Sequence, residues 1–256
     1  MRVFVTGAAN GIGRATVERL VKRDHKVIAY DKDGEALEDL PDPVETYEGD
    51  VRDREKVEEV VRKEIFNVLV NCAGFQEQGA VEDMPSEKFH EHFETNFFGT
   101  LNCVKTALPM LRERDGRIIN ISSIAGKATI PFLGAYSASK HAVEGFSDAL
   151  RMELRDSEVD VVVVEPGPIK TGFNEEAEKA LDQYVPESRY SAEYRDRINS
   201  VNDGAEPDKA AETVVKAVES SRPKVRYTVT LQAYFIRKLK PFVPSSLFDF
   251  LASRRQ

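Results

Sequence analysis

Short apolar runs alternate with amphipathic stretches along the first two thirds of the chain. The runs are too short for helices, and several are rich in β-branched residues, so we interpret them as buried strands. The predicted strands cover residues 2–6, 26–30, 44–48, 68–70, 118–121 and 159–165. Amphipathic segments with helical spacing lie between most of them, at residues 14–23, 54–64, 86–111 and 134–156. The pattern is that of an α/β fold, in which the run at 159–165 suits a central parallel strand.

The last third of the chain has a different character. Residues 173–205 are polar with scattered tyrosines. A segment of this length indicates a lid over a substrate, with an ordinary surface excursion as the alternative. A helix at 210–220 and a strand at 225–231 follow. The extension over 231–256 is basic and apolar; a packed terminal helix is expected there, and contact with a substrate pocket or a membrane surface is the alternative.

Composition limits the class of protein. A chain of 256 residues can bury one large core, and we expect a single domain over 1–256. The net charge of -8, with charges interspersed, argues against a nucleic-acid partner.

No targeting signal is visible, and no apolar run approaches the roughly 18 residues that span a bilayer. Cys72 and Cys103 lie among apolar neighbours, which indicates free thiols in a reducing, cytoplasmic location. The four histidines show no metal-ligand pattern, so no metal is expected.

A glycine-rich loop directly follows the first predicted strand. Gly7, Gly11 and Gly13 lie between that strand and an amphipathic helix, which is the order that a dinucleotide site requires. The turn must be tight, the backbone must approach a pyrophosphate, and the helix N-terminus must face that anion. We therefore predict a dinucleotide cofactor.

The end of the second strand bears on which dinucleotide is bound. Asp31 stands there, where an acidic residue accepts hydrogen bonds from ribose hydroxyls and repels a 2′-phosphate. Asn10 brings no positive charge into the loop. NAD is therefore preferred to NADP, although Lys32 follows Asp31 and weakens that preference.

Tyr136 and Lys140 form the centre of the predicted chemistry. In a helix that starts near Gly134 they are four residues apart and share one face. A fixed ammonium beside the phenol, with a cationic cofactor ring close by, favours phenolate and lowers the tyrosine pKa toward the working range. Ser123 follows the strand at 118–121, so its hydroxyl would lie at the ligand-binding edge of a parallel sheet. A solvated helix face is the alternative for the Tyr-Lys pair alone.

Two further segments contain candidate site residues. Small residues after the strand at 68–70, Ala73 and Gly74, would let the backbone pass close to a flat ring or ribose, with a plain turn as the alternative. Asn96 lies in the middle of the helix predicted at 86–111, which Ser86 is expected to cap. A buried amide needs partners, and a locally open helix would let Asn96 hold an ordered water.

Taken together, these residues resemble the short-chain dehydrogenase/reductase family over residues 2–172. The matching positions, in family order, are Thr6, Gly7, Gly11, Ile12 and Gly13 in the cofactor loop; Asn71, Ala73 and Gly74; the catalytic tetrad Asn96, Ser123, Tyr136 and Lys140; and Pro166, Gly167 and Thr171. The resemblance implies a doubly wound (Rossmann) sheet of seven mainly parallel strands. It also implies hydride transfer between a nicotinamide cofactor and a small-molecule alcohol or carbonyl, in a homodimer or homotetramer.

The same resemblance assigns roles to individual residues. It implies that Tyr136 is the base, that Lys140 also binds the nicotinamide ribose, and that Ser123 holds the substrate oxygen. Asn96 resembles the water-holding member of a proton relay. The remaining implied cofactor contacts are Asp50 and Val51 to adenine, Ile169 and Thr171 to the carboxamide, and Asn10 with the loop glycines to the diphosphate.

Three functions remain open from the sequence. The first is an NAD-dependent secondary-alcohol dehydrogenase with a lipophilic substrate, because the aromatic, basic end of the chain resembles members that act on bulky lipophilic alcohols. The second is an NADPH-linked carbonyl or 3-oxoacyl reductase. The third is a dinucleotide-sensing protein without turnover. The chain also lacks the glycine-rich terminus of many tetrameric members, which leaves its quaternary state open.

Overall fold

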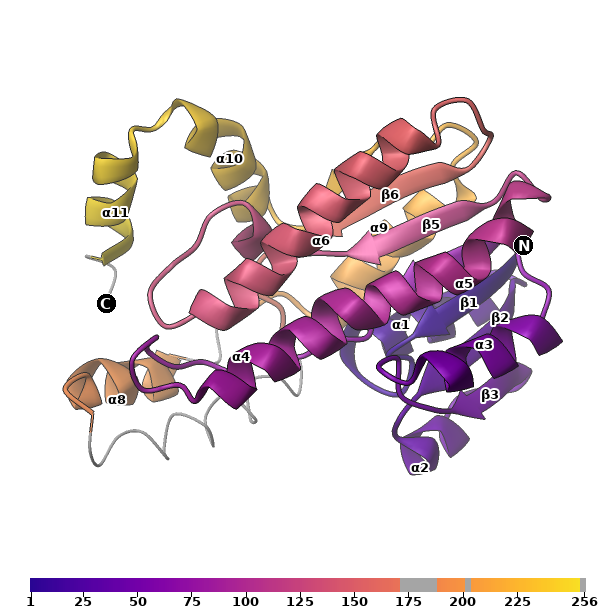
Figure 1. The fold of residues 1–256 in the computed structure, drawn as a ribbon, viewed down its shortest axis with the longest axis horizontal. Helices are drawn as coiled ribbons and strands as arrows, with labels where there is room; N and C mark the ends of the chain where they lie inside the picture. The colour runs from indigo at the N-terminus through magenta and orange to yellow at the C-terminus, as the bar shows by residue number, and fades with distance from the viewer. Residues whose placement is uncertain (171–187, 201–203, 254–256) are drawn as a thin grey trace.

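A seven-stranded parallel sheet forms the centre of the molecule (Figure 1). The computed structural model describes residues 1–170, 188–200 and 204–253, with no side chains described at 197–200. The strands lie in the order β3-β2-β1-β4-β5-β6-β7. Their bounds are β1 Arg2–Thr6, β2 Lys26–Asp31, β3 Val44–Glu48, β4 Val68–Asn71, β5 Arg117–Ile121, β6 Asp160–Glu165 and β7 Arg226–Thr228. The strand order reverses between β1 and β4, which makes the sheet doubly wound, as predicted.

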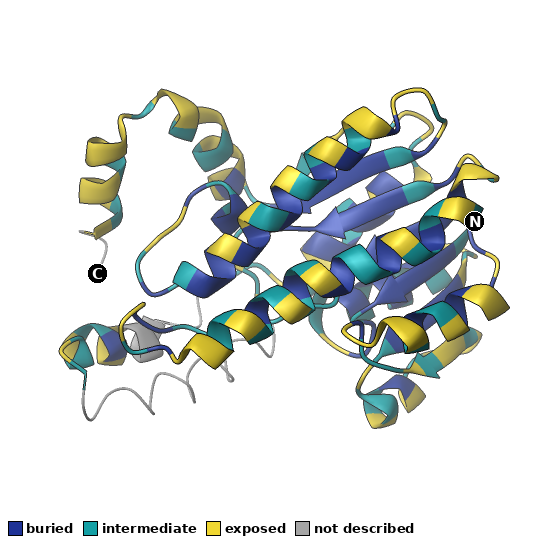
Figure 2. Cartoon of the chain, viewed as in Figure 1, coloured by how far each residue is buried: buried dark blue, intermediate teal, exposed yellow. Residues whose placement is uncertain are grey.

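Helices cover both faces of the sheet (Figure 1). Their bounds are α1 Gly11–Val21, α2 Gly34–Glu38, α3 Arg54–Lys63, α4 Ser86–Phe93, α5 Thr100–Arg112, α6 Gly134–Glu153, α8 Ser191–Ser200, α9 Pro207–Glu219, α10 Leu231–Leu239 and α11 Ser245–Ser253. Helices α1 and α9 lie on one face, and α3, α5 and α6 lie on the other. Figure 2 shows that the inner strands and the inward helix faces are buried, whereas the edge strands β3 and β7 are partly exposed.

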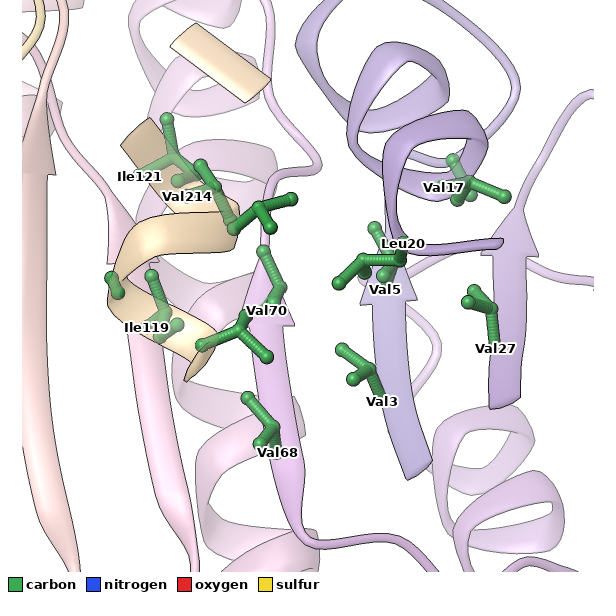
Figure 3. Packing of buried hydrophobic residues seen from close by; sticks show 14 of the residues in the cluster. Val3, Val5, Val17, Leu20, Val27, Val68, Val70, Ile119, Ile121 and Val214 are labelled. Carbon is green, nitrogen blue, oxygen red and sulfur yellow. The ribbon is translucent and has the colours of Figure 1, made fainter. Parts of the chain in front are cut away.

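Alternate residues of each strand supply the two core layers. Val3 and Val5 of β1 pack in the layer with α1 and α9, seen in Figure 3, whereas Phe4 between them packs in the opposite layer. The same alternation separates Ile119 from Ile118 on β5. Because successive side chains of a strand point to opposite faces, an uninterrupted apolar run is needed to fill both layers. This is why the apolar runs predicted the strands correctly.

Several element boundaries differ from the sequence prediction. Helix α1 begins at Gly11, inside the glycine loop, so Gly11 and Gly13 lie in its first turn. The strand expected at 225–231 is confined to β7, because the Thr230 hydroxyl accepts a hydrogen bond from the backbone of Ala233 and so caps α10. Helix α2 was not predicted; Asp33 caps it by accepting from the backbone N–H of Ala36 at 3.0 Å.

The long helix expected over residues 86–111 is divided into three parts. A π-helical segment, Glu94–Gly99, separates α4 from α5. Ser86 is the first residue of α4 and makes no capping hydrogen bond, so the predicted cap is wrong. Proline precedes it and fixes the backbone at the helix start instead. The wider π turn lies at Asn96, where a locally open helix was expected.

Candidate active site

The glycine loop closes tightly against the end of β4. Gly7 has a φ of +64°, and a Cβ there would lie 2.7 Å from the backbone of Ala73. A Cβ on Gly13 would lie only 1.8 Å from the carbonyl oxygen of Gly7. The Thr6 hydroxyl accepts hydrogen bonds from the backbone N–H groups of Cys72 and Ala73, at 3.1 and 3.2 Å. Only glycine therefore permits the close approach that the loop makes.

The first turn of α1 is arranged to receive an anion. Asn10 is in the N-cap position in an extended conformation, and no side chain within the described residues caps this helix. The backbone N–H groups of Gly11, Ile12 and Gly13 begin the helix, where such groups have no intrahelical partner. A helix N-terminus of this kind stabilises a phosphate by both its donors and its dipole. The loop fits the diphosphate of a dinucleotide.

Two aspartates flank the loop at the ends of β2 and β3. The Asp31 carboxylate accepts from the backbone N–H groups of Ala9 and Asp33, both at 3.0 Å. Each of its oxygens keeps a second lone pair for a ribose hydroxyl. The Asp50 side chain is instead engaged by Arg52, whose guanidinium and hydrogen bonds lower the pKa of that carboxyl despite partial burial. Val51 packs against Gly99, where a Cβ would meet the valine side chain at 2.5 Å.

Asn71 is oriented toward a neighbouring strand. It pairs in register with Asn120 on β5, and its Nδ2 donates to the Asn120 Oδ1 at 2.8 Å. Asn120 in turn donates to Ser147 of α6 at 2.9 Å. The Asn71 Oδ1 is buried and accepts no hydrogen bond from the described residues. Gly74, further along the same segment, lies where a Cβ would meet the Asn96 side chain at 2.8 Å.

Ser123, Tyr136 and Lys140 meet at the carboxyl end of β5. All three side chains are buried, at 8, 9 and 6 % exposure. The Tyr136 phenol lies within hydrogen-bonding reach of the Ser123 hydroxyl, so the two can hold one oxygen between them. Lys140 lies one turn further along α6, with its Nζ 5.8 Å from the centre of the Tyr136 ring. That Nζ donates to the carbonyl oxygen of Ile121 at 3.0 Å, which fixes its position at the strand end.

Without a cofactor, burial has the largest effect on the pKa values of Tyr136 and Lys140. It raises the pKa of Tyr136 to about 12, and the hydrogen bond from Ser123 only partly opposes that shift. It lowers the pKa of Lys140 to about 8. The expected lowering of the tyrosine pKa by Lys140 is therefore not found in the polypeptide alone, because removing both groups from water disfavours their charged forms.

Asn96 joins the catalytic helix to the segment after β4. Its Oδ1 accepts from the backbone N–H of Phe75 at 2.9 Å, and its Nδ2 donates to the Phe75 carbonyl and to the Ser139 hydroxyl, both at 3.0 Å. The Ser139 hydroxyl donates to the carbonyl oxygen of Tyr136 at 2.8 Å. Both amide hydrogens of Asn96 are thus committed to protein atoms, which leaves one lone pair of its Oδ1 for a water.

The geometry of the site agrees with comparisons to known proteins. The family model for short chain dehydrogenase matches residues 1–182. The chain belongs to the short-chain dehydrogenase family. It is 35% identical to a probable short-chain type dehydrogenase/reductase, VdlC, of Helicobacter pylori, covering 96% of this chain and 94% of that protein. It is 32% identical to the 3-ketodihydrosphingosine reductase of Bacteroides thetaiotaomicron, covering 97% and 95%.

A solved structure extends this likeness to the fold. A short chain dehydrogenase of Burkholderia cenocepacia in complex with NADP superposes with a TM-score of 0.81 at 26% identity, covering 96% of this chain and 94% of that one. This dehydrogenase is therefore an NAD(P)-dependent oxidoreductase acting on small molecules, and the predicted family and doubly wound fold are confirmed. Among the described residues no helix is long and apolar enough to cross a bilayer.

The motif after β6 is held by its neighbours. The carbonyl oxygen of Pro166 accepts from the Ile124 backbone N–H at 2.8 Å. A Cβ on Gly167 would lie 2.4 Å from the Thr230 hydroxyl oxygen. Ile169 pairs with Ala205 in an isolated bridge. Thr171, the last predicted cofactor contact, lies outside the described residues, as does most of the proposed lid.

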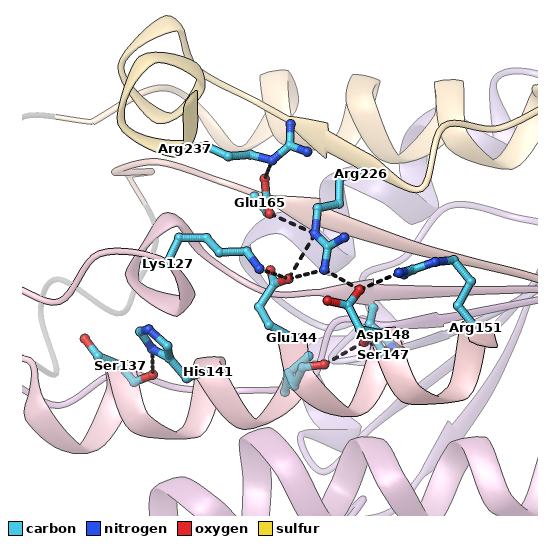
Figure 4. A network of polar contacts seen from close by, with 12 residues as sticks. Lys127, Ser137, His141, Glu144, Ser147, Asp148, Arg151, Glu165, Arg226 and Arg237 are labelled. Atoms are coloured by element: carbon cyan, nitrogen blue, oxygen red, sulfur yellow. Dashed lines mark hydrogen bonds and ion pairs between the residues drawn. The ribbon is translucent and has the colours of Figure 1, made fainter. Parts of the chain in front are cut away.

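A buried charge network beside this motif could not be predicted from the sequence of the dehydrogenase. Glu165, fully buried at the end of β6, lies 3.3 Å from the Arg226 Nε and 3.2 Å from the Arg237 Nε (Figure 4). Arg226 also pairs with Glu144 at 3.0 Å and Asp148 at 2.5 Å. The network ties the catalytic helix α6, strands β6 and β7, and helix α10 together next to the site.

Glu165 should make the stability of the dehydrogenase depend on pH. Burial, with the nearby Glu144 carboxylate, raises the pKa of Glu165 to about 7, although Arg237, Lys127 and Arg226 oppose that shift. An acid whose pKa is raised on folding adds stability below its unfolded pKa, and this is lost as pH rises through the folded value. The free energy of unfolding should fall by about 1–2 kcal/mol between about pH 5 and about pH 8. Urea denaturation across this range measures the fall.

Glu165→Gln should remove most of this pH dependence, whereas Glu35→Gln, at an exposed position of α2, should leave it unchanged. An equal slope in the Glu165→Gln variant and the unsubstituted protein would mean that other groups cause the fall.

Two other residues near the site were missed by the sequence analysis. Ser139 links Asn96 to Tyr136, and its position between Tyr136 and Lys140 is the one signal that could have indicated a role. His92 is fully buried; its Nε2 accepts from the backbone N–H of Glu77 at 3.0 Å, and its Nδ1 donates to the Lys88 carbonyl at 2.7 Å. Burial lowers the pKa of His92, which favours the neutral imidazole. The neutral ring links the segment after β4 to α4 through its two hydrogen bonds.

Proposed function

We propose that this dehydrogenase transfers hydride between NAD(H) and a lipophilic secondary alcohol or ketone. The observation that carries the proposal is the convergence of the Tyr136 phenol and the Ser123 hydroxyl, one helical turn from Lys140, at the carboxyl edge of the sheet. The glycine loop lies along the same edge, because both follow carboxyl ends of parallel strands.

The chain's own residues position the substrate and move its proton. Ser123 donates a hydrogen bond to the carbinol oxygen, and Tyr136 takes the hydroxyl proton during oxidation or returns it during reduction. When bound, the nicotinamide accepts or supplies the hydride, and its oxidised ring is cationic. Lys140, held by the Ile121 carbonyl, places a second positive charge near the phenol and would bind a ribose hydroxyl of the cofactor. These charges oppose the burial that raises the pKa of Tyr136.

The polar residues around this pair would complete the path for the proton. Asn96 fixes Ser139, and Ser139 fixes the backbone of Tyr136, so the amide orients the base through its helix. We assign the water-holding role to the remaining lone pair of the Asn96 Oδ1 rather than to its amide hydrogens. We keep the cofactor contacts that were proposed from the sequence. Among them, the Asn71 Oδ1 accepts no hydrogen bond from the described residues, so it can accept one from a donor on the cofactor.

The cofactor preference should be for NAD. Asp31 presents a carboxylate beside the loop, and its negative charge would lie close to a 2′-phosphate. We expect NAD to bind at least about tenfold more tightly than NADP, and Asp31→Asn to reduce that ratio by about tenfold. Isothermal titration of both dinucleotides measures the ratio. Asp33→Asn, at the cap of α2, is the matched control and should leave the ratio unchanged.

A reductase that uses NADPH is the second candidate. Two observations favour it: one relative is named as a 3-ketodihydrosphingosine reductase, and one structural neighbour was solved in complex with NADP. Tighter binding of NADPH than of NADH would favour this candidate and contradict the role given to Asp31. A panel of secondary alcohols and ketones of increasing chain length, followed by the absorbance of the reduced cofactor, gives the substrate class and direction.

We also propose that α8 belongs to a substrate lid within the single domain. Tyr194 of α8 is fully buried, accepts from the backbone N–H of Ala80 at 2.7 Å and donates to Asp83 at 2.6 Å. Its ring packs on Phe132, two residues before α6 begins, with the ring centres 5.2 Å apart. The segment that leads into the catalytic helix therefore supports α8. We expect the dehydrogenase to be a cytoplasmic homodimer or homotetramer. Light scattering measures the number of subunits.

A further inference from the structure

The last two described helices form an arm that carries its apolar side chains on the outside. The C-terminal arm, residues 231–253, comprises α10, a 3-10 turn at Lys240–Phe242, and α11. Figure 1 shows it projecting from the end of the molecule toward which β5 points. Eight of the fifteen large apolar side chains that are exposed in the described residues belong to this arm, under a tenth of the chain: Leu231, Tyr234, Phe235, Leu239, Phe242, Leu247, Phe250 and Leu251.

The exposed residues of the arm follow the spacing of one helix face. Leu231, Phe235 and Leu239 are four residues apart on α10, so they form a stripe. They are 76, 56 and 56 % exposed. Helix α11 has no buried residue at all. The sequence expectation of a packed terminal helix is therefore wrong for most of the arm, because its apolar face points into solvent.

The opposite side of α10 attaches the arm to the active-site edge. Ala233 is fully buried, and Arg237 reaches back to pair with Glu165 at 3.2 Å (Figure 4). Thr230 caps the helix and lies against Gly167 of the motif after β6. The Lys240 Nζ lies 4.8 Å from the centre of the Phe248 ring, which holds the two helices of the arm together. These contacts hold α10 against the carboxyl edge of the sheet, beside the site.

The charge of the arm opposes that of the remaining chain. The arm contains Arg237, Lys238 and Lys240 against Asp249, a net charge of +2, whereas the whole chain carries -8. Lys238 lies within the apolar stripe and is exposed. An exposed apolar face with interleaved lysines is suited to an anionic lipid surface, where the apolar side chains insert and the ammonium groups meet phosphates. The other exposed large apolar side chains among the described residues are spread along the sequence from Met1 to Val225.

We propose that the C-terminal arm docks this dehydrogenase on an anionic phospholipid surface, lying in the interface without crossing it. Because the arm is attached beside Gly167 and Glu165, docking would turn the carboxyl edge of the sheet, with Ser123 and Tyr136, toward the lipid. A lipophilic substrate would then pass from the bilayer to the site without entering bulk water. This last step rests on the proposed function, whereas the docking itself does not.

Co-sedimentation with vesicles tests the docking directly. The full chain should bind phosphatidylcholine vesicles that contain phosphatidylserine, and bind pure phosphatidylcholine at least about tenfold more weakly. Phe235→Ser/Phe242→Ser and Lys238→Glu/Lys240→Glu should each weaken binding by about tenfold or more. Matched controls should bind like the unsubstituted chain: Ile65→Ser/Met152→Ser removes exposed apolar groups elsewhere, and Lys22→Glu/Lys105→Glu makes the same charge change elsewhere.

Two other measurements keep the test decisive. Tyr136→Phe should bind vesicles normally, so a failure of the proposed chemistry would not imitate a failure of docking. Turnover of a short water-soluble alcohol should be unchanged in the arm variants, which shows that they fold. Absence of vesicle binding, or equal binding by arm and control variants, would overturn the proposal. A dimer that dissociates in Phe235→Ser/Phe242→Ser without any vesicle binding would assign the arm to a second copy instead.

Discussion

Tyr136→Phe should lower kcat by about 10²–10⁴-fold, the range expected when a positioned acid-base group is removed. The substitution deletes one oxygen from a buried side chain and leaves the ring in its place. Ser123 keeps the hydrogen bond that it accepts from the Ala125 backbone N–H at 3.1 Å, so the edge of the site stays ordered. Steady-state kinetics of alcohol oxidation and ketone reduction should both show the loss, because one group serves both directions.

The control for this substitution is Tyr47→Phe on β3, an edge strand of the sheet. The Tyr47 hydroxyl bonds to Glu64, so the variant loses a comparable oxygen without touching the site. It should keep full turnover. Dinucleotide binding by Tyr136→Phe should stay within about tenfold of the unsubstituted protein, since one hydrogen bond contributes about 0.5–1.5 kcal/mol of net affinity. Unchanged turnover in Tyr136→Phe would remove the phenol from the mechanism altogether.

Gly13→Ala should disrupt the cofactor loop through a steric clash. The added methyl would lie 1.8 Å from the Gly7 carbonyl oxygen and 2.7 Å from its carbon, both backbone atoms that cannot turn aside. We expect a loss of about 3 kcal/mol in the free energy of unfolding, at the upper end for an overpacked site. Dinucleotide affinity should fall by more than about tenfold, because the N–H groups of the first helical turn must shift. Urea denaturation and calorimetric titration measure the two effects.

Gly145→Ala provides the matched control for this clash. Gly145 lies within α6, and a Cβ there would meet nothing within 4 Å. The same substitution should therefore raise stability by about 0.5–1 kcal/mol, since alanine is the better helix former and loses less backbone entropy on folding. If both variants were equally stable and bound the dinucleotide equally, the tight packing of Gly13 on Gly7 would be incorrect.

The strands and the catalytic helix could be predicted because local sequence determines them. Val3, Phe4 and Val5 must be apolar to fill layers on both sides of the sheet, and this leaves a signal within five residues. Tyr136 and Lys140 are one turn apart on any helix that contains both. Nothing outside residues 134–153 is needed to bring them onto the same face.

The partners of Asn71 and Asn96 could not be predicted in the same way. Asn71 meets Asn120 because β4 and β5 are neighbours in register, and Asn96 meets Phe75 and Ser139 because a π turn rotates it toward them. Both arrangements depend on strand order and on packing between helices. The hydrogen bonds that these two side chains make therefore could not be inferred from the motifs alone.

The sequence by itself determined the parallel α/β core, the glycine loop and the spacing of the proposed catalytic pair, Tyr136 and Lys140, because periodicity and steric demand act between near neighbours in the chain. Only the tertiary structure decided that Glu165 is buried between Arg226 and Arg237, 61 and 72 positions further along, and that the arm presents Phe235, Phe242 and Phe250 to solvent. An amphipathic helix has the same pattern whether its apolar face is covered or bare. What covers that face is set by distant elements and by partners.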